Sequence, residues 1–416
     1  MTKVARLVLP VGLVTSASAW LAAGASSMGD WPHDAGRAVR PLAHGDVGRY
    51  LSEHVGMGPV ATLVQAPFAA LAGGGELSAY RWACFPCLLV AGMVGLYLAG
   101  IARRRGVSRI GQALIASLFL VNPLTVEALQ WGHPEEILTA ALAVAAVAAA
   151  SEGKPRGAAA LLGLALASKQ WALIAILPTL MALPGNRFRT GAVALAVAAA
   201  LMLPGILAAP GGFADTQAGS AHTKGVVTPW SFWYAGSSVK TETVGAPPTT
   251  MVVQVHRPPP LVAAISRPLI VLLAFAIPIG LGLRRRSFAL SGPDAMALLA
   301  LLALLRCFLD PVDNVYYHAP LLLAVIGWDA LACRGLPLRS LLATAVAFVF
   351  REWSLNLQDL HLYNYAYISL MLTAAAAIVA SLRPGNLNFI EKPEFSGDEA
   401  QVSGIKKTAQ RPINAL

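Results

Sequence analysis

Residues 78–105 read SAYRWACFPCLLVAGMVGLYLAGIARRR. The apolar run 78–101 is long enough to cross the ~30 Å hydrocarbon core of a bilayer as one helix. Three arginines follow it directly, and the positive-inside rule assigns such a cluster to the cytoplasmic side. Runs of this kind, rich in Ala, Leu and Val, recur along almost the whole chain. The sequence therefore predicts an all-α polytopic membrane protein.

The composition excludes the other broad classes of protein. The 416 residues are 56% hydrophobic and 12% charged, and the mean hydropathy is +0.62, whereas soluble domains have about 45–50% apolar and about 25% charged residues. A soluble enzyme and a disordered protein are both excluded, and the alternating segments of an outer-membrane barrel are absent. The lysines and arginines behind the net charge of +10 cluster in short loops. They therefore indicate how the chain is oriented in the lipid membrane, and we expect no nucleic-acid partner.

The cysteines do not form a disulfide framework. Cys84 and Cys87 have CxxC spacing but lie at the start of an apolar run, and the sequence has no second pair of this kind. We expect these two, together with Cys307 and Cys333, to be buried thiols.

Charge clusters and turn residues give the order of the membrane segments. The sequence predicts about 12 segments, with both termini cytoplasmic, when the hairpin 157–184 counts as two. The other predicted spans are 8–25, 78–101, 109–130, 135–150, 191–209, 260–283, 293–309, 317–333, 338–351 and 362–382. They form a core over 1–383 with outer loops at 26–77 and 210–258. The polar tail 384–416 is predicted to be a disordered cytoplasmic extension.

Two predicted segments are too short to cross the membrane alone. Residues 57–72 should form an interfacial helix within the first outer loop. Each arm of the hairpin 157–184 has about 13–15 residues, or roughly 20–22 Å of helix. Its turn places Lys169 at the outer half of the membrane, where an ammonium needs an anionic partner or water. A lipid phosphate would satisfy it; the alternative is snorkelling to the interface beside Trp171.

Titratable residues concentrate on the predicted outer face, and we expect the chemistry there. The first outer loop contains GDWPHDAGR at 29–37 and HGDVGRY at 44–50. A carboxylate just after the first span is suited to act as a general base for an acceptor hydroxyl. Asp34 and Asp30 are the candidates, with Asp46 as a substrate-binding residue or substitute base; each acid is equally suited to capping a helix. A divalent metal is possible, but no spacing here specifies a ligand set, and no cofactor is assigned.

A second outer motif joins two predicted spans. Trp131, His133 and Glu135 are candidate substrate-binding residues, with the indole as a stacking face for a sugar. The structural alternative is a helix start, because Pro134 suits a first turn and acidic side chains there complement the helix dipole.

A third outer motif, DPVDNVYYH, occupies 310–318. Asp313 can cap a helix, and we also consider it and Tyr317 as substrate-binding residues. His318 lies one turn into a predicted span, where an ionisable group is a functional candidate. Arg306 adds a cation one turn before the motif.

The order of these motifs resembles that of the GT-C superfamily of membrane glycosyltransferases, and more narrowly the actinobacterial polyprenol-phosphate-mannose-dependent α-mannosyltransferases. Those proteins carry an early Asp followed by a Gly and a Tyr, and Asp34, Gly45 and Tyr50 match loosely, with a first tyrosine missing. Their Gly-containing turn after the third span is similar to 132–135, where Glu replaces an amide. Their small-residue helix ending in Lys is matched well by 160–169.

The late motif of that family is only partly kept, since 310–318 retains the Pro and the His. The similarity spans roughly 1–380, and the order of the motifs carries it. It implies an inverting transfer of a sugar, mannose in the narrower family, from a polyprenyl-phosphate donor. The acceptor would be a glycolipid or cell-wall glycan outside the plasma membrane.

The resemblance also implies roles for the residues. Asp34 would take the proton of the acceptor hydroxyl, with Asp30 or Asp46 as its substitute. Lys169, Arg306 and His318 would hold the donor phosphate, and His318 would also be catalytic. Two other classes stay open: a transporter or flippase of lipid-linked sugars, and a non-catalytic scaffold with the same fold.

Overall fold

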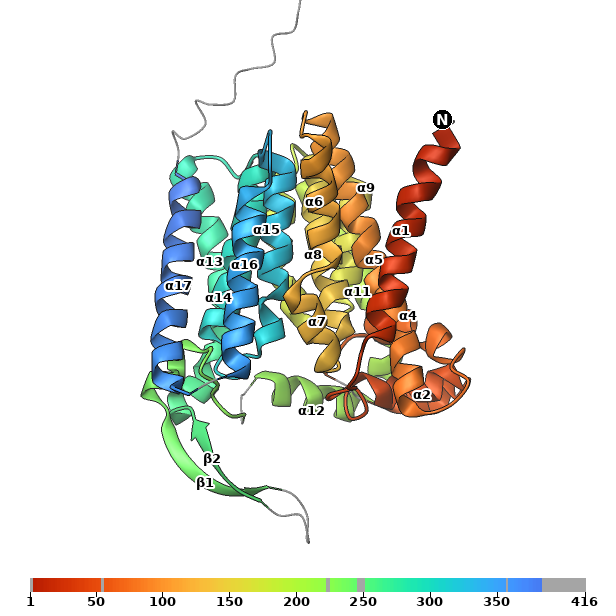
Figure 1. Cartoon of the computed structure of the whole chain (residues 1–416), viewed down its shortest axis with the longest axis vertical. Coiled ribbons are helices and arrows are strands. Elements are labelled where there is room, and N and C mark those ends of the chain that lie inside the picture. Colours follow the sequence, from red (N-terminus) through yellow and green to blue (C-terminus); the bar gives the residue numbers. More distant parts are fainter. Residues whose placement is uncertain (1–2, 54–55, 222–224, 245–250, 357, 384–416) are drawn as a thin grey trace, which may run out of the picture. The chain divides into compact units, whose positions relative to one another are not determined.

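Helices make up most of the described structure (Figure 1). The computed structural model describes residues 3–53, 56–221, 225–244, 251–356 and 358–383. The chain divides into a unit Met1–Leu382, which holds every described helix and strand, and a unit Arg383–Leu416. The predicted tail 384–416 lies outside the described residues.

The helices before the long outer loop follow the order of the predicted segments. They are α1 (Lys3–Ala23), α2 (Ala35–Ala43), α3 (Val47–Ser52), α4 (Pro59–Ala69), α5 (Glu76–Arg104), α6 (Arg109–Leu120), α7 (Pro123–Gln130), α8 (Pro134–Ser151), α9 (Pro155–Leu166), the 3-10 helix η1 (Gln170–Ala175), α10 (Ile176–Ala182) and α11 (Arg187–Ala208).

The long loop and the C-terminal half contain the remaining elements. They are α12 (Pro210–Ala221), η2 (Phe232–Gly236), β1 (Ser238–Val244), β2 (Met251–Arg257), α13 (Pro260–Arg285), α14 (Gly292–Leu309), η3 (Val315–His318), α15 (Ala319–Ala332), α16 (Leu338–Leu355) and α17 (Leu360–Ser381).

Among the described residues, 8 helices are long and apolar enough to cross a membrane. They are α5, α6 with α7, α8, α11, α13, α14, η3 with α15, and α17. The shorter apolar helices Val8–Ala23, Pro155–Leu166 and Gln170–Ala182 coincide with predicted segments, and α16 coincides with the predicted span 338–351. The predicted class, an all-α polytopic membrane protein, is confirmed.

Helix α8 lies at the centre of the bundle and packs against α5, α9, α14 and α15. In its apolar window 94% of the residues are buried, against 11% in α11. Most residues from Ala140 to Ala150 are alanines, and small side chains let helices approach closely in a membrane. The first turn of α8 therefore presents Glu135 and Glu136, both buried, at one end of the bundle.

The predicted short hairpin is present as α9, η1 and α10, and the start of α4 docks on its turn. Gly58 N donates to Ser168 O at 2.8 Å, and Val60 N donates to Ala167 O at 3.0 Å. A Cβ on Gly58 would lie 2.1 Å from Ala167 O, so this approach requires glycine. The first outer loop thereby fixes the backbone immediately before Lys169.

Figure 1 shows α2, α4, α12 and the β-hairpin at one end of the bundle, and the start of α1 and the end of α17 at the other. The two predicted outer loops, 26–77 and 210–258, therefore lie at the same end.

A β-hairpin in the long loop was not predicted. Strands β1 and β2 pair antiparallel, with Ser238 opposite Arg257 and Val244 opposite Met251. Arg257 and Glu242 form a cross-strand ion pair with Nη2 and Oε2 2.5 Å apart. Neither strand strictly alternates polar and apolar residues, and no described residue of either strand is buried, so the sequence signal for a strand is weak.

Two glycines allow the first outer loop to meet the end of α7. Gly132 has φ +87°, and a Cβ there would lie 2.1 Å from Met28 O. Gly29 has φ +46°, and a Cβ there would lie 2.1 Å from Trp131 O. Asp30 N donates to Trp131 O at 3.0 Å. This contact brings the acidic residues of the loop toward His133.

We expect Gly132→Ala to destabilise the protein by about 3 kcal/mol or more, because it adds a backbone clash to the strain of a left-handed alanine. Gly106→Ala is the matched control, since Gly106 has φ +81° with open space around its Cβ, and it should cost only about 1 kcal/mol. Thermal unfolding midpoints in detergent measure both. Equal losses would contradict the proposed contact.

Candidate active site

A buried cluster of opposite charges joins the start of α8 to the turn before η1. Lys169 Nζ lies 3.1 Å from Glu135 Oε1 and 3.0 Å from Glu136 Oε1. The two glutamates are 0% and 1% exposed. Charges this deep are tolerated only when they are paired, so these three side chains hold the two segments together.

Helix α14 adds a second cation to the cluster. Arg306 Nη2 lies 3.4 Å from Glu136 Oε1. Its guanidinium carbon lies over two aromatic rings, 4.8 Å from the Trp171 centroid and 4.6 Å from the Tyr317 centroid. These two cation–π contacts, together with the ion pair to Glu136, hold the guanidinium in place.

The expectation of a lone ammonium at Lys169 is corrected by this cluster. The sequence predicts a lipid phosphate as the partner of Lys169, or snorkelling beside Trp171, but the chain itself supplies Glu135 and Glu136. Glu136 was missed because its place in a first helical turn already explained it. Glu135, predicted to bind substrate, also contacts His133.

His133 links the cluster to the first outer loop. Its Nδ1 is 2.9 Å from Glu135 Oε1, its Nε2 is 3.6 Å from Asp30 Oδ2, and its ring stacks on Tyr316 with centroids 4.7 Å apart. Burial lowers the pKa of His133, but the hydrogen bonds to Asp30 and Glu135 outweigh burial and raise that pKa to about 9. The imidazole is therefore a cation at neutral pH.

The three aspartates of the first outer loop have different environments. Asp34 precedes α2 without capping it; burial raises its pKa, and the nearby His133 charge opposes this. The hydrogen bond from His133 lowers the pKa of Asp30. Asp46 Oδ1 accepts from Arg49 N at 2.9 Å and caps α3, as the structural alternative expected. Asp34 is thus the most basic carboxylate of those near His133.

A cavity of about 530 Å³ opens beside the charged cluster. Its walls combine cations and their carboxylate partners with apolar side chains from η1 and α13. The lining includes Lys169, Arg267, Arg306, Glu136, Asp310, Tyr317, Trp171, Leu173, Ile174, Ile270 and Val271. Arg267, whose Nε is 3.4 Å from Asp310 Oδ2, was not among the predicted site residues. Its position inside an apolar span is the sequence signal that could have identified it.

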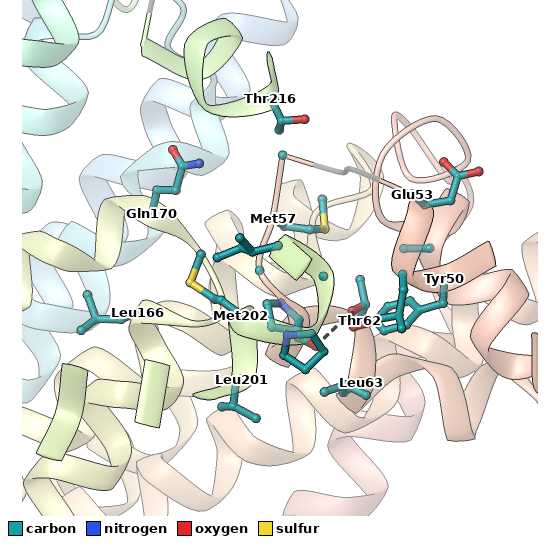
Figure 2. Close-up of a pocket in the computed structure, with 18 of the residues that line it drawn as sticks. Tyr50, Glu53, Met57, Thr62, Leu63, Leu166, Gln170, Leu201, Met202 and Thr216 are labelled. Atoms are coloured by element: carbon teal, nitrogen blue, oxygen red, sulfur yellow. Dashed lines mark hydrogen bonds between the residues drawn. The ribbon is translucent and has the colours of Figure 1, made fainter. Parts of the chain in front are cut away.

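A second cavity, of about 290 Å³, lies between the first outer loop and α11 with α12 (Figure 2). Tyr50 and Thr62 line it, with their hydroxyl oxygens 3.1 Å apart. Gly56 and Gln170 line both cavities. The two spaces therefore adjoin at the turn that follows Lys169.

Other predicted site residues lie apart from the charged cluster. Trp131 directly follows α7, is 45% exposed and donates from Nε1 to Glu127 Oε1 at 2.8 Å. His318 Nε2 lies 3.0 Å from the Tyr367 hydroxyl and 3.4 Å from Asp313 Oδ2. His318 lines a third, largely apolar cavity of about 600 Å³. The structure thus brings Lys169 and Arg306 together, and with them Tyr317, but not His318.

The fold is of the GT-C type, which confirms the resemblance to that superfamily noted above. It is similar to that of ArnT from Cupriavidus metallidurans, whose crystal structure has bound undecaprenyl phosphate. The TM-score is 0.50 at 17% identity, covering 92% of this chain and 71% of that chain.

The chain belongs to glycosyltransferase family 87, whose sequence model matches residues 58–311. The comparison with curated proteins finds no match.

The raised pKa of His133 makes folding stability depend on pH. A cation whose pKa rises from 6.5 to about 9 on folding stabilises fully below pH 6.5 and loses that contribution as the pH rises through 9. We expect unfolding midpoints in detergent to fall between pH 6.5 and 9.5 by an amount equivalent to roughly 3 kcal/mol. His133→Gln should remove this part of the slope, and parallel profiles for the two proteins would contradict the assignment.

Proposed function

We propose that this protein transfers a sugar, mannose in our assignment, from a polyprenyl-phosphate donor to a hydroxyl of a glycolipid or cell-wall glycan, with inversion. The observation that carries the proposal is the cavity in which Lys169, Arg267 and Arg306 meet apolar walls. A lipid phosphate has the same two parts, an anionic group and a hydrocarbon chain.

The cations suit the leaving group of this reaction. Negative charge grows on the phosphate as its bond to the anomeric carbon breaks, and fixed cations lower the barrier by stabilising that growth. Glu136 and Asp310 hold Arg306 and Arg267 in place without filling the cavity. The undecaprenyl phosphate bound to ArnT supports a donor of this chemical class.

Asp34 is our proposed general base, with Asp30 as the substitute. Its carboxylate takes the proton of the acceptor hydroxyl while the acceptor oxygen forms a bond to the anomeric carbon. The bond from that carbon to the phosphate oxygen breaks, and polyprenyl phosphate leaves. The raised pKa of Asp34 supports this choice, since it makes the carboxylate a better proton acceptor.

Two features of the structure support proposed binding positions for the donor sugar and for the acceptor. Glu136 Oε2 is buried without a hydrogen-bond partner among the described residues, and Glu136 lines the cationic cavity. This oxygen is therefore suited to accept a hydrogen bond from a sugar hydroxyl. The adjoining cavity at Tyr50 and Thr62 (Figure 2) is our proposed acceptor entrance. Mannose itself rests on the resemblance to the polyprenol-phosphate-mannose-dependent enzymes.

We propose that the site faces the extracytoplasmic side of the plasma membrane and that both termini are cytoplasmic. Helix α8 supports this, because its two ends differ in charge. Its first turn joins the site, whereas Glu152, just after its last turn, forms ion pairs with Arg104 and Arg105. A cluster of arginines marks the cytoplasmic side.

The direct test is sugar transfer by purified protein in lipid, with radiolabelled polyprenyl-phosphate mannose and a panel of glycolipid and glycan acceptors. We expect Asp34→Asn to lower the transfer rate roughly 100- to 10,000-fold while donor binding survives, because it removes only the base. Asp46→Asn is the matched control and should keep the rate of the wild type, since Asp46 caps α3.

The possible outcomes separate the alternatives. Transfer that persists in Asp34→Asn would move the base to Asp30. A wild-type protein that neither transfers mannose nor binds its donor would contradict the mannose assignment. Donor binding without transfer to any acceptor would favour the flippase or the scaffold.

A further inference from the structure

Three potential metal ligands meet on the side of the α14–η3 turn that the proposed reaction does not use. Cys307, Asp313 and His318 each offer one ligand atom, and these atoms all lie within 4.8 Å of one another. Cys307 and Asp313 are 0% exposed. A thiol, a carboxylate and an imidazole therefore converge in a buried space.

The carboxylate of Asp313 lacks the partners that its burial demands. Neither of its oxygens has a hydrogen-bond partner among the described residues, although a buried polar group without one destabilises the fold. Its place is fixed through its main chain, because Asp313 O accepts from Thr228 Oγ1 at 2.7 Å and from Trp230 Nε1 at 2.5 Å. A cation held between Asp313, Cys307 and His318 would satisfy the carboxylate.

The spacing between His318 and Asp313 suits a small transition-metal ion. Zinc binds Cys sulfur at about 2.3 Å and His nitrogen or carboxylate oxygen at about 2.0–2.2 Å, so neighbouring ligand atoms are roughly 3.3–3.7 Å apart in a tetrahedral site. His318 Nε2 and Asp313 Oδ2 are 3.4 Å apart. A set with sulfur and nitrogen favours zinc over magnesium or calcium, which prefer oxygen ligands alone.

The surroundings of His318 and Cys307 are compatible with ligation. His318 Nδ1 lies 3.1 Å from Val315 O, and donation to that carbonyl leaves Nε2 without a proton and free to bind a metal. The Tyr367 hydroxyl lies 3.0 Å from Nε2 and would give up its hydrogen bond to that nitrogen when a metal binds there. Cys307 Sγ is 3.0 Å from Tyr317 O; its thiol would release a proton to solvent when the metal binds.

We propose that Cys307, Asp313 and His318 bind one zinc ion. The ion would act by positioning the active site. Arg306 and Tyr317, which line the cationic cavity, are the chain neighbours of Cys307 and His318. A metal bridge between those neighbours would fix the backbone that presents the Arg306 guanidinium.

The test uses the full chain, purified in detergent without a polyhistidine tag, stripped with a chelator, and titrated with zinc chloride. Zinc per chain is measured by mass spectrometry of the elements after removal of free ion. We expect about one zinc in the wild type and in Cys333→Ser, a control that removes a half-buried thiol outside the trio. Cys307→Ser and His318→Gln should bind at least roughly 100-fold more weakly.

Cobalt binding gives a second test of the site, which needs no substitution of Cys307, Asp313 or His318. Cobalt bound to the wild type should show a sulfur-to-cobalt charge-transfer band, and Cys333→Ser should keep it. Absence of this band, absence of stoichiometric zinc in the wild type, or zinc binding that is unchanged in Cys307→Ser would each overturn the proposal.

Discussion

The site depends on a buried pairing between two carboxylates and two cations from three separate segments. Glu135 and Glu136 begin α8, Lys169 follows α9, and Arg306 ends α14. Leaving any one charge without its partner costs about 3–5 kcal/mol in a buried site. The segments must therefore close together at one end of the bundle, and the cationic cavity forms where they meet.

Much of the fold could be predicted because hydropathy and charge act locally along the chain. The Ala-rich run of α8, the arginines at the end of α5 and the short arms around Lys169 each have their own sequence signal. The β-hairpin at 238–257 was missed, since two short strands that pair only with each other bury no apolar face. The packing of α8 at the centre also had no local signal beyond its small residues.

The sequence predicted several residues of the site but not the contacts between them. Lys169 and Arg306 were selected as lone ionisable groups in apolar surroundings, and they do lie together. Their pairing with Glu136 connects residues far apart in sequence, so no local pattern encodes it. The sequence also did not show which way the His318 side chain points. Adjacent residues at the start of a helix face different sides, and of Tyr317 and His318 only Tyr317 lines the cationic cavity.

The central claim is that these cations bind a lipid phosphate, and the affinity for sugar-free polyprenyl phosphate tests it most directly. Native mass spectrometry in detergent can measure Kd for the wild type, Arg306→Gln and Arg267→Gln, with exposed Arg37→Gln as the control. The half-buried Arg267 keeps the test valid if the Arg306 variant unfolds. We predict Kd at least roughly tenfold higher for both cavity variants, the loss of one charge-assisted hydrogen bond, and unchanged for Arg37→Gln. Unchanged affinity in the cavity variants, or an equal loss in the control, would contradict the account.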